Sequence, residues 1–385
     1  MKKCDINIYV NNHGRKDGIE DYISLFQAIF SRHNYRCQVS NRYEPGIPNI
    51  IIEEFTNYLE NQKLEQFREH NPGTPLILVL TEFMEIKWGV RALNHFGGIV
   101  DSCLLALMNP ILMNRRKDLP SPRLGDWLKV VLFSPVLLAL AIYQGALYGL
   151  RRIIPFVRWG RGEPIRTRIS KVCYWRLRYL GLMQHLDKFD KILCSHEEIW
   201  PQMIKNRAVN KTDNRFVGVV YPEFDVQKVI GHLFVDKKNK LEITGSTTPY
   251  RQKWAEKVNF QILSYGLHHV IDMVEVIPWG DHNPDRERAS YSLHPPQTKN
   301  WPYSSPTRIY RALSEDGNIP VITRHFGQNP IEDVCLVYTG IDTLAQMIDF
   351  WEHHYRACEQ VGKRMQAYNA AVEIKNNIMM SNILG

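Results

Sequence analysis

Short apolar runs bounded by polar turns recur through the first half of the chain. Between them lie stretches with helical spacing, one starting near Ile19 and one over residues 197–204. Runs of this length and composition are typical of buried strands. The predicted strands are Ile6–Val10, Arg36–Ser40, Pro75–Leu80, Lys191–Ser195 and Phe216–Val220. Strands separated by helices predict right-handed crossovers in a parallel sheet.

The same alternation returns in the second half. From about Asp225 the chain turns polar, and we interpret residues 236–240 (Asp-Lys-Lys-Asn-Lys) as part of a linker. A helix is predicted from Pro249 to about Leu263, and helical sequence from about Asp342 to the end. Predicted strands are 241–244, 274–277, 289–293, 319–322 and 336–338. We therefore predict an α/β protein with two Rossmann-like domains, an N-terminal one over 1–225 and a C-terminal one over 226–385 that closes with a helix.

An apolar segment interrupts the first pattern. Val130 to Leu150 contains no charged residue, and its length is near the roughly 20 residues that a helix needs to cross a bilayer. Pro135, Gln144 and Gly145 lie inside it, and a single crossing would separate two halves of one sheet. Two interpretations stay open, which are a re-entrant or surface-lying helical hairpin and a buried helix of a large core.

Basic residues follow this apolar segment directly. Residues 151–178 carry one acidic side chain, Glu163, against Arg151, Arg152, Arg158, Arg161, Arg166, Arg168, Lys171, Arg176 and Arg178. Such a cluster next to an apolar run favours an anionic membrane surface over nucleic acid as the partner. We expect an apolar and basic helical insertion at about 100–178 that holds the protein, as a peripheral protein, at the cytoplasmic face of the cell membrane.

Composition narrows the class of protein. With 385 residues, 44% hydrophobic and 23% charged, the chain is predicted to be globular and to form more than one core. Its 7 cysteines are scattered, with no C-x-x-C pair, which favours a reducing cytosol and gives no zinc site. The apolar run after Lys2 and Lys3 is too short for a signal peptide.

The most informative chemistry lies at the start of the helix predicted after residue 304. Ser304 and Ser305 come first, Pro306 suits the first helical position, and Thr307 and Arg308 follow. We expect Ser305 to cap the first-turn amides. A helix start that combines amides, a positive dipole end and a guanidinium is an anion site, most naturally for phosphate. The alternative is an ordinary capped helix with a solvated Arg308.

A second helix start carries a similar set of groups. Thr244, Gly245 and Ser246 follow one predicted strand, and Arg251 lies in the first turn of the next helix. His294 ends another strand. In a parallel sheet these loops open at the same carboxyl edge, where ligands of such folds bind. Two converging loops of this kind favour a nucleotide with a diphosphate group as the ligand.

One block carries a family resemblance. Arg311-Ala312-Leu313-Ser314, then Gly317, then Ile319-Pro320-Val321, resembles the signature of the donor domain of GT-B glycosyltransferases. Tyr303 and Arg311 stand where the large retaining families of this fold have two glutamates, so the resemblance is not to those families. Arg311 would meet a phosphate or an acidic sugar carboxylate, or point to solvent.

The resemblance implies transfer of a sugar from a nucleotide-sugar donor to a polysaccharide or lipid-linked glycan. Helix amides with Arg251 and Arg308 would stabilise the leaving phosphate, so no metal or other cofactor is expected. A general base would come from the first domain. Its candidates are His13 and Asp17 after the first strand and Glu82 after the third, each of which could equally be an ordinary surface residue. A sugar-nucleotide epimerase of the same fold and a non-catalytic nucleotide-sugar-binding module remain alternatives.

Overall fold

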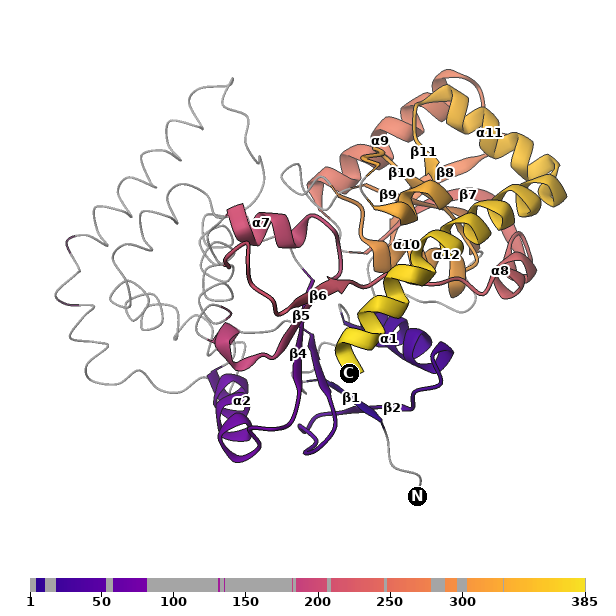
Figure 1. Ribbon diagram of the computed structural model, residues 1–385. Helices are drawn as coiled ribbons and strands as arrows, with labels where there is room; N and C mark the ends of the chain where they lie inside the picture. Colours follow the sequence, from indigo (N-terminus) through magenta and orange to yellow (C-terminus); the bar gives the residue numbers. More distant parts are fainter. Residues whose placement is uncertain are drawn as a thin grey trace.

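The computed structural model describes residues 5–10, 19–52, 58–81, 131, 135, 182, 185–205, 209–245, 248–277, 288–295, 303–327 and 329–384. It confirms the α/β class and two sheets of parallel strands, an arrangement compatible with two Rossmann-like domains (Figure 1).

The first sheet has the strand order β2-β1-β3-β4-β5-β6, with every neighbouring pair parallel. Its strands are β1 (Ile6–Tyr9), β2 (Cys37–Ser40), β3 (Asn49–Ile52), β4 (Leu76–Leu80), β5 (Lys191–Cys194) and β6 (Phe216–Val219). The helical segments of this part are α1 (Glu20–Arg32), α2 (Tyr58–His70), the 3-10 turn η1 (Leu186–Lys188) and α7 (Ile199–Lys205).

The second sheet has the order β11-β10-β9-β7-β8, again all parallel. Its strands are β7 (Lys237–Thr244), β8 (Asp272–Ile277), β9 (Arg288–His294), β10 (Ile319–Ile322) and β11 (Leu336–Val337). The accompanying helices are α8 (Val226–His232), α9 (Pro249–Ser264), α10 (Pro306–Ser314), the 3-10 turn η2 (Pro330–Val334), α11 (Ile341–Glu352) and α12 (His354–Leu384).

All the predicted strands and helices that lie among the described residues form, with ends that shift by a few residues. One strand, β3, was missed, because its apolar run follows a stretch with Pro45, Gly46 and Pro48 that is typical of turns. It lies between β1 and β4, so the run at Pro75–Leu80 is the fourth strand and not the third.

The predicted linker over residues 236–240 was wrong. Asp225 is the N-cap of α8, where its side chain accepts a 3.1 Å hydrogen bond from the amide of Lys228. Lys237 already belongs to β7, the strand between β8 and β9. Its Nζ donates to the main-chain oxygens of Asp316 and Gly317, at the C-terminal end of α10. The polar residues 236–240 therefore lie at the amino end of a central strand. Lys237 of this strand stabilises the C-terminal end of α10.

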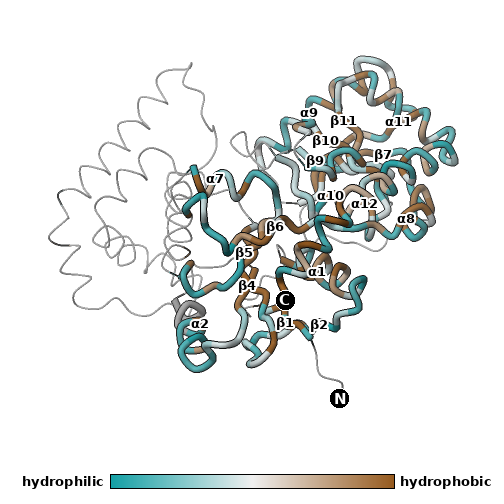
Figure 2. Tube along the Cα trace, in the orientation of Figure 1, coloured by the Kyte–Doolittle hydropathy of each residue, from teal (hydrophilic) through white to brown (hydrophobic). Residues whose placement is uncertain are grey.

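The inner strands β1, β3 and β4 of the first sheet are buried on both faces. Ile6, Ile8, Ile50, Ile77 and Ile192 are each fully buried, as expected for parallel strands covered by helices on both sides. Strands β4, β5 and β6 accordingly fall in the hydrophobic part of the colour scale (Figure 2).

The long helix α12 joins the two sheets. Its N-terminal part packs on α11 and η2, and its C-terminal part lies against β6 in the first sheet (Figure 1). Near that end, Lys191 Nζ donates to the main-chain oxygen of Ile383 at 3.1 Å. Asn376, fully buried, donates to Tyr221 O at 2.9 Å and to Glu223 Oε1 at 2.7 Å.

The proposed insertion lies, apart from Val131 and Pro135, outside the described residues. Within the described parts of the chain, no helix is both long and apolar enough to cross a bilayer.

Candidate functional site

The candidate site residues lie where the strand order of the second sheet reverses. The chain passes from β7 outward to β8 and then returns to the other side of β7 to form β9. Loops that leave neighbouring strands in opposite directions open a crevice at the carboxyl edge, and ligands of such sheets bind there. Thr244 ends β7 and Gly245 follows it, and His294 ends β9. The sequence therefore identified residues on both sides of this switch point.

Two arginines converge on Gly245. A Cβ built on this glycine would lie 2.7 Å from Arg251 Nη1 and 3.5 Å from the Cζ atoms of both Arg251 and Arg308. The two guanidinium carbons are thus separated by at most about twice that distance. Gly245 has φ +115°, a conformation that side chains rarely adopt, and its amide donates to Ile277 O at 3.0 Å. A glycine is required here for its backbone conformation and for the space that the arginines occupy.

The two arginines come from separate helices. Arg251 is in the first turn of α9 and only 1% exposed, although arginine is seldom fully buried. Thr248 caps this helix by accepting from the Arg251 amide. Arg308 is in the first turn of α10 and half-buried. Two guanidinium groups this close to one point attract an anion, which would gain two charge-assisted hydrogen-bonding partners there.

His294 is the third group at this edge. It pairs with Ile322 of β10, is 7% exposed, and burial lowers its pKa to about 4. The imidazole is therefore neutral near pH 7. Its Nε2 atom is buried without a hydrogen-bond partner among the described residues. Buried polar atoms in native proteins are nearly always partnered, so this nitrogen is available to a ligand group.

The start of α10 differs in one respect from the prediction. Ser305 occupies the N-cap, but its side chain does not accept from a first-turn amide as we expected. Its Oγ lies 2.9 Å from Thr307 Oγ1 instead, because the two hydroxyls face each other across Pro306. Ser304 and Thr307 are buried. Three hydroxyl side chains thus surround the first turn that carries Arg308.

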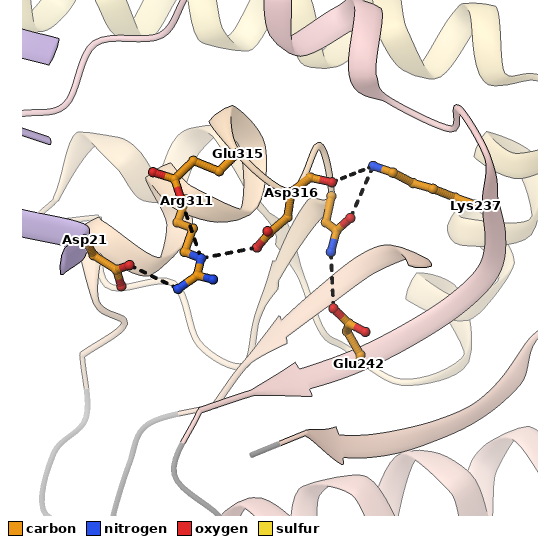
Figure 3. A network of polar contacts seen from close by, with 7 residues as sticks. Asp21, Lys237, Glu242, Arg311, Glu315 and Asp316 are labelled. Atoms are coloured by element: carbon orange, nitrogen blue, oxygen red, sulfur yellow. Dashed lines mark hydrogen bonds and ion pairs between the residues drawn. The ribbon is translucent and has the colours of Figure 1, made fainter. Parts of the chain in front are cut away.

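Arg311 lies in a cluster of carboxylates. Its Nη1 is 3.2 Å from Asp21 Oδ1 in α1, and its Nε is 3.7 Å from Glu315 Oε2 and 3.6 Å from Asp316 Oδ2. Figure 3 shows the guanidinium between Asp21 on one side and the two carboxylates of its own segment on the other. With 16% of its side chain exposed, Arg311 neither points to solvent nor lacks negative partners. The sequence alone did not suggest Asp21.

Asp21 is a buried carboxyl group with a raised pKa. It is 8% exposed, and burial raises the pKa of its carboxyl to about 6, although Arg311 and Arg308 both favour the ionised form. Desolvation therefore outweighs the attraction of two guanidinium groups.

Aromatic rings in contact connect the carboxyl edge of the first sheet with that of the second sheet. His196, directly after β5, lies with its ring centroid 4.8 Å from that of Tyr303, which in turn is 4.9 Å from Phe326. Arg324 lies over Phe326. Tyr303 is two residues from the N-cap of α10, so His196 places the first sheet's edge against the helix that carries Arg308.

His196 and Glu332 were missed by sequence reasoning. His196 Nδ1 accepts from the Glu198 amide at 3.1 Å, which assigns the proton to Nε2, and burial lowers its pKa to about 4. Glu332 is 2% exposed and accepts from the amides of Phe326 and Gly327. His196 follows the buried strand β5 closely, and this position at a carboxyl edge was the available signal. Glu332 lies in η2, well after the end of β10, and no local pattern marked it.

Several predicted residues lie outside the described residues. These are Ser246 in the phosphate loop and the three candidate bases, His13, Asp17 and Glu82. In the sequence His13 and Asp17 follow β1, and β1 lies between β2 and β3, which makes it the switch point of the first sheet. Among the described side chains, no group of three or more His, Cys, Asp or Glu residues is placed to hold a metal ion.

Comparison with known proteins gives no family assignment. Neither the protein-family models nor the curated proteins contain a match to this chain. The site geometry is therefore the basis for a functional conclusion.

Proposed function

We propose that the protein is a GT-B glycosyltransferase that moves a sugar from a nucleotide-sugar donor to a polysaccharide or lipid-linked glycan. The observation that carries the proposal is the convergence of Arg251 and Arg308 on Gly245, at the switch point of the second sheet. Both guanidinium groups can donate charge-assisted hydrogen bonds to the diphosphate of a nucleotide-sugar donor. The sequence block from Arg311 to Val321, which resembles the donor-domain signature, supports the same conclusion.

The reaction assigns a role to these groups. The acceptor hydroxyl oxygen forms a bond to the anomeric carbon, while the bond from that carbon to the donor phosphate oxygen breaks and its electron pair leaves with the nucleoside diphosphate. The hydroxyl proton passes to a base, for which His13, Asp17 and Glu82 are the candidates. Arg251, Arg308 and the first-turn amides of α10 stabilise the charge that builds on the leaving phosphate.

The location follows from the segment outside the described residues. The apolar run at 130–150 and the basic stretch at 151–178 would hold the enzyme at the cytoplasmic face of an anionic membrane. A lipid-linked acceptor would then reach the space between the two carboxyl edges.

A binding panel tests the proposal. Detergent-purified full-length protein is mixed with UDP, GDP, CMP, ADP and dTDP, and its thermal stability is measured. A ligand at about 100 times its dissociation constant adds about 2.7 kcal/mol to the free energy of unfolding. We expect one nucleotide to stabilise the wild type and Arg308→Ala to remove the effect. Arg356→Ala, at a solvent-exposed position of α12, is the matched control.

Turnover is then tested with the sugar form of the nucleotide that binds and with membranes as acceptor. Release of the nucleoside diphosphate that depends on membranes supports a transferase. A reducing nucleotide-sugar product formed without any acceptor would instead support the epimerase. Failure of every nucleotide to bind would overturn the proposal.

A further inference from the structure

Glu332 is a buried carboxylate that follows strand β10, and its two oxygens are not equally satisfied. We propose that Glu332 is a specificity-determining residue of the donor site, whose Oε1 atom accepts a hydrogen bond from a sugar hydroxyl of the bound nucleotide sugar. This role rests on the proposed function, under which the hydroxyl belongs either to the ribose or to the sugar that is transferred.

The two oxygens of Glu332 have different surroundings. Oε2 accepts from the amide of Phe326 at 2.7 Å and from the amide of Gly327 at 3.2 Å, in the loop that follows β10. Oε1 is buried and has no hydrogen-bond partner among the described residues. An acceptor in a protein interior is nearly always hydrogen-bonded, because otherwise its full desolvation cost remains. Oε1 is therefore a buried acceptor that can take a donor from a ligand.

The position of this carboxylate is fixed by its own segment. Asn329 caps η2 by accepting from the amide of Ile331 at 3.2 Å, and the main-chain oxygen of Asn329 accepts from the Glu332 amide at 2.9 Å. Ile331 and Val334, on either side of Glu332, are buried. Together with the two amides on Oε2, these contacts hold Glu332 in place, so Oε1 is a preorganised acceptor.

The loop after β10 also places Glu332 close to the start of α10. The ring centroid of Phe326 lies 4.9 Å from that of Tyr303, and Tyr303 is two residues before the N-cap of the helix that carries Arg308. Arg324 lies over the Phe326 ring, 4.6 Å from its centroid. Aromatic rings with a few fixed polar groups are typical of small-molecule sites. Glu332 therefore lies in the same region of the carboxyl edge as the anion site.

The negative charge of Glu332 decides which part of a ligand it can meet. A carboxylate accepts hydrogen bonds and repels phosphate, so the diphosphate is left to Arg251 and Arg308 at Gly245. In a nucleotide sugar, the ribose and the transferred sugar are the groups bonded directly to the phosphates. Their hydroxyls are therefore the nearest donors for Oε1.

Burial explains why such a contact would be selective. It raises the pKa of the Glu332 carboxyl even though the amides of Phe326 and Gly327 donate to it. Two amides thus do not offset the desolvation, and a further donor would favour the ionised form. A ligand without the hydroxyl would leave Oε1 unpaired, and sites of this kind discriminate strongly against such ligands.

Pairs of nucleotides test this role on the full-length wild type. CMP, UDP, GDP and ADP are each compared with their 2′-deoxy and 3′-deoxy forms by titration calorimetry at constant ionic strength. If the hydroxyl belongs to the ribose, the nucleotide that binds should bind on the order of tenfold more tightly than a deoxy form. If it belongs to the transferred sugar, the deoxy forms should bind equally well. UDP-glucose, GDP-mannose, ADP-glucose or CMP-sialic acid should then bind more tightly than its free nucleotide, by a similar factor.

Glu332→Gln tests the oxygen itself. The side-chain oxygen of glutamine can keep the bonds from Phe326 and Gly327, which leaves an NH₂ group, unable to accept, in place of Oε1. E332Q should lose most of the preference for the hydroxylated ligand, while hydrogen exchange of the Phe326 and Gly327 amides stays slow. Asp333→Asn is the matched control, because Asp333 is the next residue of η2 but exposes 71% of its side chain and pairs with His325. It should bind every ligand as the wild type does.

Each outcome supports or overturns the role of Glu332. The same hydroxyl preference in wild type and E332Q would overturn it and leave the anion site standing. Equal weakening of hydroxylated and deoxy ligands, with fast exchange of the Phe326 and Gly327 amides, would show that Glu332 only supports the loop. A wild type that prefers neither the ribose forms nor the sugar nucleotides would overturn the role without any variant.

Two further outcomes separate this role from the proposed function. Failure of every nucleotide and sugar nucleotide to bind the wild type would overturn both. A hydroxyl preference that depends on Glu332, with no sugar transferred to any acceptor, would keep the role of Glu332 and remove the transferase.

Discussion

The ring of Tyr303, just before α10, lies against the ring of His196, just after β5, with centroids 4.8 Å apart. Asp21 of α1 meets the same helix further along, through Arg311. The first-sheet part of the chain therefore contacts α10 at both of its ends, while the helix itself presents Arg308 to the switch point of the second sheet. A movement of α10 would therefore change the Tyr303–His196 contact, the Arg311–Asp21 contact and the position of Arg308.

The contact between Tyr303 and His196 predicts a measurable coupling. Stacked or tilted ring pairs contribute about 0.5–1.5 kcal/mol beyond their buried area. We expect a double-mutant cycle of Tyr303→Ala and His196→Ala, measured by urea unfolding, to give an interaction free energy in that range. Tyr303→Phe keeps the ring and should keep the coupling. Additive single-variant effects would show that the rings do not stabilise each other.

Gly245→Ala should damage both the fold and the anion site. The new methyl group would lie 2.7 Å from Arg251 Nη1, and the backbone has φ +115°. We expect a loss of about 1–3 kcal/mol from backbone strain, together with loss of nucleotide binding because Arg251 must move.

Gly46→Ala is its control. Gly46 also has a positive φ, +77°, but a Cβ there meets nothing within 4 Å. It should lose stability through strain alone and bind nucleotide as the wild type does. Equal nucleotide binding by the Gly245→Ala variant would contradict the role of this loop.

Asp21→Asn should stabilise the protein above pH 6. The pKa of Asp21 rises from 3.8 in the unfolded chain to about 6 in the fold, so its favourable contribution is complete below pH 3.8 and is lost as the pH rises through 6. The shift corresponds to up to about 3 kcal/mol. Chemical unfolding at pH 7.5 and pH 4 measures the difference, which should be largest at pH 7.5 and small at pH 4. A variant less stable than the wild type at pH 7.5 would contradict the desolvation of Asp21.

Asn376→Ala should loosen the C-terminal part of α12. Its amide donates to Tyr221 O and Glu223 Oε1 in a fully buried position. Loss of both bonds leaves buried acceptors unsatisfied, at a cost of about 1–3 kcal/mol. The exposed neighbour Asn377 provides the matched control, since Asn377→Ala should unfold at the wild-type urea concentration. Hydrogen exchange at residues 376–384 should accelerate only in the Asn376 variant.

Much of the secondary structure was predictable, because apolar runs such as Leu76–Leu80 and Ile319–Ile322 bury on both faces of parallel sheets and so stand out in the sequence. The segment at Lys237 was mistaken for a linker, since its lysines resemble solvated loop residues until the C-terminal end of α10 is seen beside them. Likewise β3 was missed because it directly follows a stretch with Pro45, Gly46 and Pro48, which resembles a loop.

The sequence by itself determined the local chemistry of the candidate site. Hydroxyls, a glycine and an arginine at two helix starts indicate a candidate anion site, because capping, dipole and charge are all properties of neighbouring residues. Tertiary structure decided which charges share it. Asp21 and Arg311 are 290 positions apart. A local sequence pattern cannot relate two residues at that separation. Their distance, their burial and the resulting rise in the pKa of Asp21 exist only once α1 packs against α10, since desolvation and Coulomb attraction depend on position in space and not on order along the chain.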